Sequence, residues 1–264
     1  MEIKNLRTYL QDIEKKHPEA ILRIKEPLRV SYEITAVQRK LDQKRKYPLM
    51  IIEKPILDNG EESAFPVVTN LTASRDLCAK AIGINPQRVA MEYNNKIKQR
   101  IDPVKIEKEA APVKEVIERE GDVNLLQFPI LTHNYMDPGP YIATGFVSTY
   151  DPDTGVDNCS LQRIWVKSKN RTGYWPATGS HNWNNMQKWW ARGEDMPIAI
   201  WIGHHPAALT GGQARLAYPE SHYPAIGGIM GAPVRLVPTE TFGDKLMVPA
   251  DAEIVIEGYV PKDI

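Results

Sequence analysis

Apolar residues recur with a helical period near the start of the chain. Leu6, Leu10 and Ile13 share one face in NLRTYLQDIEKKHP, which predicts a helix that ends before the following proline. We expect further helices in EITAVQRKLDQ and in SRDLCAKAIGI, where Ser74 would be the N-cap. The short apolar runs of AILRIKEP, PLMIIEKP and FPVVTNLTAS predict strands. This alternation indicates a small α/β domain over residues 1–105.

The next stretch has few apolar residues. Residues from about 93 to 121 are rich in charge and are interrupted by Pro103 and Pro112. We therefore expect a connecting segment here, and we place it at 106–124 between two domains.

The pattern changes again over residues 125–264. YIATGFVSTY and NCSLQRIWV are β-like runs on either side of DPDTG, which predicts a hairpin. Further short strands are expected in PIAIWIG, GAPVRLVPTE, LMVPA and EIVIEGYV, whereas NWNNMQKWWARG is the one good helix. Many short strands with one or two helices favour a β-rich barrel or sandwich. The fold class predicted for the chain is therefore α+β.

Composition narrows the class of protein. The 264 residues contain 33 Lys and Arg against 33 Asp and Glu, so nothing indicates electrostatic capture of nucleic acid or of an anionic membrane. The start, MEIKNLRTYL, has no apolar region of the secretory type, and no apolar run is long enough to span a membrane. The two cysteines, Cys78 and Cys159, are far apart in the chain, which favours a reducing cytoplasm.

One predicted strand carries unexpected polar residues. Asn158, Ser160 and Gln162 would share one face of a strand with a period of two, and Arg163 would point the other way unless a bulge re-aims it. Such a face is either a ligand site or the solvated side of an antiparallel sheet, and the segment alone leaves both open.

Other polar constellations lie further along. In ATGSHNWNN, Ser180 or Asn182 would cap the next helix, whose first N–H groups suit phosphate, with His181 beside them. We expect His204 and His205 not to share a ligand site, because neighbouring residues of a strand face opposite sides. Oxygen from Asn, nitrogen from His and the carboxylate of Glu220 would together suit Mn²⁺ or Mg²⁺ better than Zn²⁺.

These segments, in this order, resemble the UbiD family of reversible decarboxylases that use prenylated FMN. The resemblance rests on PVVTNLTASRDLCAKAIG, YIATG, DNCSLQR, GSHNW, HPAALTGG, YPESHYPAIGG and LMVPADAEIVIEG, and it covers nearly the whole chain. It implies that residues 125–264 form a split β-barrel that binds prenylated FMN, a cofactor made by a flavin prenyltransferase. The implied reaction releases CO₂ from an aromatic or α,β-unsaturated carboxylic acid.

The resemblance also implies roles for single residues. Asn158, His181 and Glu220 match the family's ligands for a divalent metal, usually Mn²⁺, that bridges to the flavin phosphate, with K⁺ held nearby on backbone carbonyls. Arg163 matches the active-site arginine beside the flavin ring and the substrate carboxylate. Cofactor contacts are implied for Thr144, Asn158, Ser160, Arg163, Ser180, His181 and Glu220.

The end of the chain departs from the family pattern. Members follow the EIVIEG strand with an acidic segment whose two glutamates act with the arginine, and with a C-terminal region that supports oligomer formation, whereas this chain ends at EGYVPKDI. We expect an N-terminal portion of a longer homo-oligomeric enzyme. The alternatives are a partner chain that completes the site, a flavin-binding module such as a flavin reductase-like split barrel, and an assembly subunit with an interface at Trp-rich residues 183–190.

Overall fold

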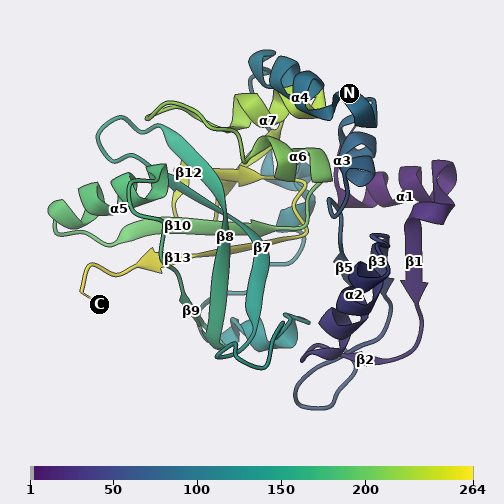
Figure 1. Cartoon of the computed structure of the whole chain (residues 1–264). Coiled ribbons are helices and arrows are strands. Elements are labelled where there is room, and N and C mark those ends of the chain that lie inside the picture. The colour runs from purple at the N-terminus through teal and green to yellow at the C-terminus, as the bar shows by residue number, and fades with distance from the viewer. Residues whose placement is uncertain (1–2, 264) are drawn as a thin grey trace.

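The computed structural model describes residues 3–263 and places two units side by side (Figure 1). The first unit contains α1 (Leu6–Lys16), β1 (Ile21–Ile24), β2 (Leu28–Arg29), α2 (Glu33–Gln43), β3 (Leu49–Ile52), β4 (Pro55–Ile56), β5 (Val67–Thr69), α3 (Arg75–Ile82) and α4 (Val89–Lys98). β1 and β3 run parallel and β5 joins them antiparallel. Their apolar residues pack against the helices in two small cores, so the expected α/β arrangement is present here.

The second unit is built around a five-stranded antiparallel sheet in the order β13-β10-β7-β8-β9. A second sheet, β12-β11-β6, curls against it and completes a half-barrel (Figure 1). The bounds are β6 (Val104–Lys105), β7 (Tyr141–Tyr150), β8 (Asp157–Ser168), β9 (Arg171–Gly173), α5 (His181–Ala191), β10 (Met196–Ile202), α6 (Pro206–Gly211), α7 (Tyr223–Met230), β11 (Arg235–Thr239), β12 (Gly243–Pro249) and β13 (Ile254–Val260). The α+β class and the β-rich second half are thus confirmed.

The central sheet separates two apolar cores. Val147 and Ile164 face the core that Met186 and Trp189 of α5 complete. Phe146, on the alternate face of β7, packs into the core beneath α6 and α7. This alternation is the period of two that a strand with both faces covered requires.

Two interpretations of the sequence are wrong at the level of elements. α4 runs to Lys98 and so covers the start of the charged stretch from about 93 to 121, because Tyr93 and Ile97 pack one turn apart against the core beneath α7. The connector placed at 106–124 stays a prediction. Within the described residues 125–263 the second half has three α-helices, α5, α6 and α7, rather than one good helix. α6 and α7 lack the usual polar and apolar alternation because nearly all their residues are buried.

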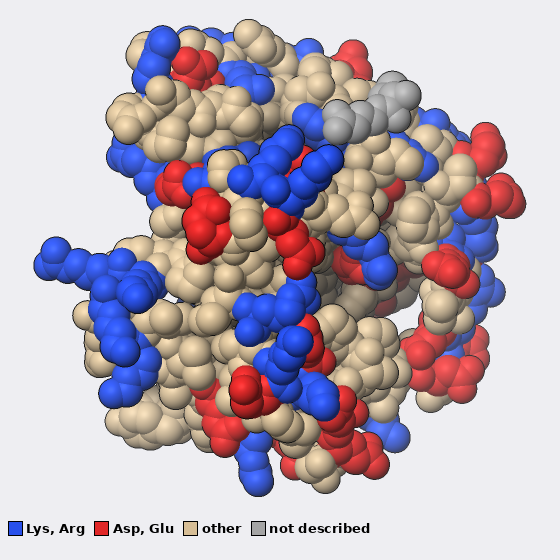
Figure 2. Space-filling view, turned by 90° about the vertical axis from the view of Figure 1, so that its right-hand side faces the viewer, with Lys and Arg blue, Asp and Glu red and all other residues tan. Residues whose placement is uncertain are grey.

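Charged residues of both signs are mixed over the face of the molecule seen in Figure 2, with no broad area of one sign. Among residues 3–263, no helix is long and apolar enough to cross a bilayer.

Candidate functional site

The polar face predicted on β8 lies against the N-terminus of α5. β7 and β8 pair in register, with Thr149 opposite Asn158 and Val147 opposite Ser160. Ser160 is bonded to an α5 side chain, whereas Cys159 belongs to the core on the other side of the sheet. Asn158 is 4% exposed. The Asn158 end of the polar face is therefore enclosed by the protein, whereas Ser160 and Gln162 are half-buried.

Asn158 and His181 come together although they are distant in the sequence. The Oδ1 atom of Asn158 lies 3.2 Å from the Nδ1 atom of His181, the first residue of α5. Ser180 caps this helix, since its hydroxyl accepts from the Trp183 N–H at 3.2 Å. Helix-start N–H groups, an imidazole and an amide oxygen thus meet at one place, which suits an anion together with a cation.

Asn182 is fully buried behind these groups. Its Oδ1 atom accepts from Asn158 Nδ2 at 2.6 Å and from Thr149 Oγ1 at 2.8 Å. Its Nδ2 atom donates to Ser160 Oγ at 3.0 Å and to the carbonyl oxygen of Val147 at 3.4 Å. The amide therefore uses its full capacity of two accepted and two donated hydrogen bonds.

Glu220 approaches the site from the loop before α7 but points elsewhere. Its Oε1 atom pairs with Arg100 Nη2 at 2.7 Å. Two residues on, the ring of His222 lies 5.8 Å from that of His181, measured between centroids. The three predicted metal ligands therefore lie in neighbouring segments, but only Asn158 and His181 are in contact through a hydrogen bond. Among residues 3–263, no three side chains of His, Cys, Asp or Glu converge on a metal position.

Two polar atoms near Asn158 are buried without a partner in the described part of the chain. They are Oδ1 of Asp157 and Nδ1 of His222. Burial raises the pKa of Asp157 to about 6, and a hydrogen bond from Ser221 opposes this shift. Burial lowers the pKa of His222 to about 4, so its ring is neutral at pH 7 and offers a lone pair.

These atoms bear on the metal and phosphate implied by the resemblance. A buried acceptor without a donor is costly in a folded protein unless a ligand or water satisfies it. The amide of Asn158, the imidazole of His181 and the carboxylate of Glu220 are donor types that suit Mn²⁺ or Mg²⁺, and no thiolate is among them. The donor types therefore fit such a group, although the Glu220 carboxylate is paired with Arg100 in this structure.

Arg163 and Thr144 face each other across a β-bulge. Ile142 pairs with Ile164 and Gly145 with Gln162, so Ala143 and Thr144 together stand opposite Arg163. We expected a bulge, a twist or a flavin lying across the strand's end to bring Arg163 and Asn158 to one cofactor. A bulge is present, but its extra residue is on β7, so β8 keeps its alternation and Arg163 stays on the face opposite to Asn158. Arg163 and Thr144 are both exposed, and within residues 3–263 Arg163 has no ion-pair partner.

Tyr218 packs against the ring of His181. The two rings meet edge to face with 5.2 Å between centroids. The Tyr218 hydroxyl donates to Asp151 Oδ2 at 2.8 Å, and Lys188 pairs with the same oxygen at 2.8 Å. Burial would raise the pKa of Asp151, but the hydrogen bonds from Lys188, the Asp153 N–H and Tyr218 lower it to about 2. A charged, buried carboxylate therefore anchors this flank of the site.

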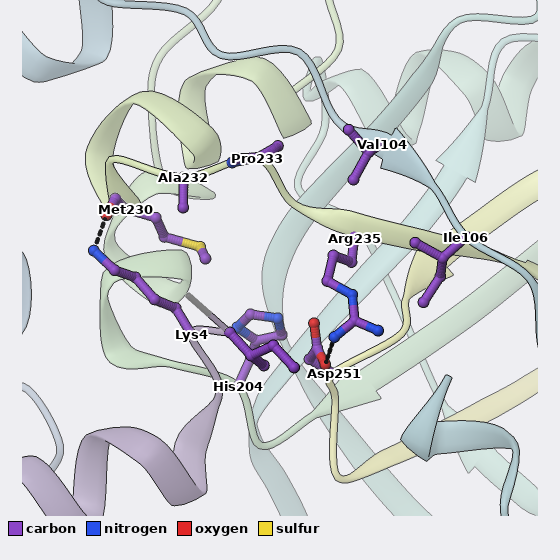
Figure 3. Close-up of a pocket in the computed structure, with 10 residues that line it drawn as sticks. Lys4, Val104, Ile106, His204, Met230, Ala232, Pro233, Arg235 and Asp251 are labelled. Carbon is purple, nitrogen blue, oxygen red and sulfur yellow. Dashed lines mark hydrogen bonds and ion pairs between the residues drawn. The ribbon is translucent and has the colours of Figure 1, made fainter. Parts of the chain in front are cut away.

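A cavity of about 330 Å³ lies away from this constellation, between the start of the chain, the end of α7 and β11 (Figure 3). Its polar groups bond to protein: Lys4 Nζ donates to the Met230 carbonyl at 2.6 Å, and Arg235 pairs with Asp251 at 3.1 Å. His204 also lines it. None of the seven residues predicted to bind the cofactor lines this cavity, and we regard it as a packing gap between the two units.

His204 and His205 have structural roles. His204 Nδ1 accepts from the His205 N–H at 2.8 Å, and His205 Nδ1 accepts from the Ala207 N–H at 3.1 Å to cap α6. The two residues lie between β10 and α6 rather than on a strand, so the reason that we gave for their not sharing a ligand site does not apply.

Sequence reasoning missed the residues that hold the site from behind, above all Asn182, Thr149 and Tyr218. Asn182 stands next to His181 in SHNW, and we considered it only as a helix cap. Its place on the inner face of α5, one residue from a predicted ligand, was the available signal.

The comparisons with known proteins agree along the whole chain. A family model described as the 3-octaprenyl-4-hydroxybenzoate carboxy-lyase Rift-related domain matches residues 104–263, and the N-terminal domain of the same carboxy-lyase matches residues 14–97. A phenolic acid decarboxylase of Sedimentibacter hydroxybenzoicus is 30% identical over 97% of this chain and 54% of its own length. An anhydromevalonate phosphate decarboxylase of Methanothermobacter thermautotrophicus is 30% identical over 92% of this chain and 53% of its own. The chain thus spans about half the length of these curated relatives.

Solved structures show the same likeness. The UbiD-class enzyme HmfF of Pelotomaculum thermopropionicum, in complex with prFMN, superposes with a TM-score of 0.88 at 31% identity, covering 98% of this chain and 58% of that one. The closed form of vanillic acid decarboxylase from Sedimentibacter hydroxybenzoicus gives 0.89 at 27% identity, covering 99% and 56%.

Proposed function

Because this chain belongs to the UbiD family of carboxy-lyases, we propose that it is the cofactor- and metal-binding part of a prenylated-FMN-dependent decarboxylase. The substrate class is an aromatic or α,β-unsaturated carboxylic acid, which would lose CO₂ reversibly. Relatives named as phenolic acid and pyrrole-2-carboxylic acid decarboxylases support this class.

The observation that carries the proposal is the contact between the polar face of β8 and the start of α5. Asn158 Oδ1 and the His181 ring are 3.2 Å apart beside the first N–H groups of a helix. A metal held by these two groups and by the single carboxylate of Glu220 would keep positive charge for a flavin phosphate, which carries nearly two negative charges at neutral pH. K⁺ on backbone carbonyls nearby belongs to the same proposal.

The remaining residues act on the substrate side. Arg163 is exposed on the face of β8 opposite to Asn158 and pairs with no carboxylate within residues 3–263, so its guanidinium would be free to hold a substrate carboxylate in a bidentate fork and orient the bond to be broken. Thr144 on the neighbouring bulge and Ser180 at the helix cap would contact the cofactor. When bound, the prenylated flavin supplies the electron sink for the pair left behind as CO₂ departs.

The acid and base groups would have to come from protein beyond residues 3–263. Within that range Arg163 has no carboxylate at ion-pair distance. A further segment of the chain, or a second subunit, would supply it; the structures of the vanillic acid decarboxylase name a second component, ShVdcD, beside the first. Formation of a homo-oligomer belongs to the same proposal.

Reconstitution with prenylated FMN and Mn²⁺ tests the proposal. The protein should retain flavin through gel filtration, whereas Asn158→Ala and His181→Ala should lose at least tenfold in flavin and Mn²⁺ retention, because each removes a donor that has no replacement. Gln187→Ala, on the exposed side of α5, is the matched control and should retain both. Equal retention in all four proteins would overturn the metal assignment.

The second candidate is a flavin-binding module without turnover of its own. The unpartnered Arg163 favours it, because an arginine that lacks its acid and base partners can bind an acid without completing catalysis. Stable flavin binding with no CO₂ release from any acid in a screen, unless the full-length chain or a second subunit is present, would support it.

A further inference from the structure

We propose that Asn182 is the positioning residue that fixes the direction of the two polar groups presented by β8. It would make Asn158 offer an oxygen lone pair and Ser160 offer a hydroxyl proton. The inference rests on the proposed metal and cofactor site. It concerns a residue that touches neither group directly.

The orientation of the Asn182 amide follows from one unambiguous contact. The Val147 carbonyl oxygen can only accept, so the atom of Asn182 that faces it at 3.4 Å must be the NH₂ group. The oxygen of Asn182 therefore faces Thr149 and Asn158. Thr149 fits this direction, because its hydroxyl receives an N–H from Asn185 at 2.9 Å and has its own proton left for Asn182.

The orientation of Asn158 follows in turn. Across the 2.6 Å contact, the oxygen of Asn182 requires the NH₂ group of Asn158. The Asn158 oxygen must then point the other way, to where His181 Nδ1 lies 3.2 Å off. Asn and Gln amides rotate readily between two orientations, and the wrong one here would turn two N–H groups toward a cation. The buried Asn182 excludes that orientation.

Asn182 also orients the hydroxyl group of Ser160. Its Oγ atom accepts from Asn182 Nδ2 at 3.0 Å and lies 3.0 Å from the terminal amide of Gln162, so its own proton points away from Asn182. The hydroxyl proton is then left to donate, and within residues 3–263 no acceptor takes it. The amide of Asn182 thus directs the Asn158 oxygen toward a cation and the Ser160 hydroxyl proton toward an anionic or carbonyl oxygen.

A double-mutant cycle on Mn²⁺ affinity tests the role, with Mn²⁺ titrated into the protein in the presence of FMN and free Mn²⁺ followed by EPR. Asn182→Leu has nearly the same shape but no polar atoms, so the Asn158 amide is free to turn. We expect Mn²⁺ binding to weaken by about 10- to 100-fold, the range for loss of a group that orients a metal ligand.

Asn158→Asp provides the rescue. A carboxylate presents an oxygen whichever way it turns, so orientation by residue 182 no longer matters. In the Asn158→Asp background the carboxylate faces the Asn182 oxygen, which can only accept, so Asn182→Leu should leave Mn²⁺ affinity unchanged or tighten it, a coupling that only an orienting role produces. An equally large loss in both backgrounds would overturn the inference, because it would reduce Asn182 to a general packing residue.

A second variant separates positioning from folding. Asn185→Leu, one turn further along α5, also removes a buried amide, which is bonded to Thr149 and to the Tyr218 hydroxyl but touches neither Asn158 nor Ser160. Its Mn²⁺ affinity should stay within about threefold of the parent at a similar loss of melting temperature. A large loss of affinity in Asn185→Leu contradicts the inference. If the parent and Asn158→Asp both fail to bind Mn²⁺, the proposed metal site itself is wrong, which is a different outcome from a cycle without coupling.

Discussion

At the scale of single residues, burial sets the protonation state of the histidine pair before α6. His204 is 1% exposed, and burial followed by repulsion from His205 lowers its pKa to about 3. Burial and the nearby charge of Lys4 lower the pKa of His205 to about 4, although Asp12 opposes the shift. Both rings are neutral acceptors of backbone N–H groups in the fold, and each must take up a proton when the chain unfolds in mild acid.

This linkage predicts a loss of stability in acid. The folded pKa values lie below the ordinary value near 6.5, so the stabilisation is complete above that pH and is lost as pH falls through 6.5 toward 4. The free energy of unfolding should drop by about 1–2 kcal/mol per histidine between pH 7 and pH 5. Urea titrations at the two pH values check this. His204→Asn, which keeps an acceptor for the His205 N–H but does not titrate, should show a smaller drop than the parent.

The residues of the site were predictable only in part. The polar residues of β8 and the SHNW segment could be recognised in the sequence as candidate ligand sites, and the resemblance assigned Asn158 and His181 to one site. The structure brings these two residues into contact. Nothing in the sequence specified that Asn182 would bond to four partners on two strands, because those contacts depend on how α5 lies on the sheet. Glu220 as a ligand stays a prediction.

At the scale of elements, α7 shows why some helices cannot be predicted from the pattern of apolar and polar residues. Its centre carries Gly227 and Gly228, which weaken an isolated helix. A Cβ on Gly227 would lie 2.5 Å from the Ile101 carbonyl oxygen, and one on Gly228 would lie 2.6 Å from that of Lys96. The glycines therefore allow the close packing of α4 on α7, a tertiary requirement. By contrast, the helix expected over Glu33–Gln43 has those bounds in the structure, because its signals are local.

Gly228→Ala should accordingly destabilise the protein. The added methyl group meets backbone rather than a side chain that can move, so α4 and α7 must separate, at a cost of about 1–3 kcal/mol. Chemical denaturation measures the change. The matched control is Gly258→Ala on β13, where a Cβ meets nothing within 4 Å and the free energy of unfolding should stay within about 0.5 kcal/mol. An unchanged Gly228→Ala would contradict the packing argument.

At the scale of the whole molecule, the first unit is joined to the second by several contacts near the site. α3 packs on α6 and α4 on α7 (Figure 1). Arg7 pairs with Glu253 at 2.8 Å, and Arg100 pairs with Glu220 at 2.7 Å. The second of these contacts holds the carboxylate of Glu220, a predicted metal ligand, against the guanidinium of Arg100 just beyond α4.

Arg100→Ala should therefore change metal binding from a distance. If Glu220 ligates the metal, the guanidinium of Arg100 competes for the same oxygen, and its removal should tighten Mn²⁺ binding about two- to fivefold, the worth of a partly exposed ion pair. Calorimetric titration in the presence of FMN gives the affinity. Arg88→Ala, which breaks the pair with Glu92 at the start of α4, should have no effect. Weaker binding in Arg100→Ala would instead indicate that Arg100 holds Glu220 in place.

The bulge opposite Arg163 also protects the fidelity of folding. A hairpin whose strands slip by one residue exchanges its two faces, which here would turn Cys159 toward α5 and drive Asn158 into the apolar core. The extra residue of β7 lies between the Ile142–Ile164 and Gly145–Gln162 pairs. If β8 shifted by one residue, the bulge would no longer stand opposite Arg163, and the pairs before and after it could not both form. The bulge thus fixes the register in which β7 and β8 pair.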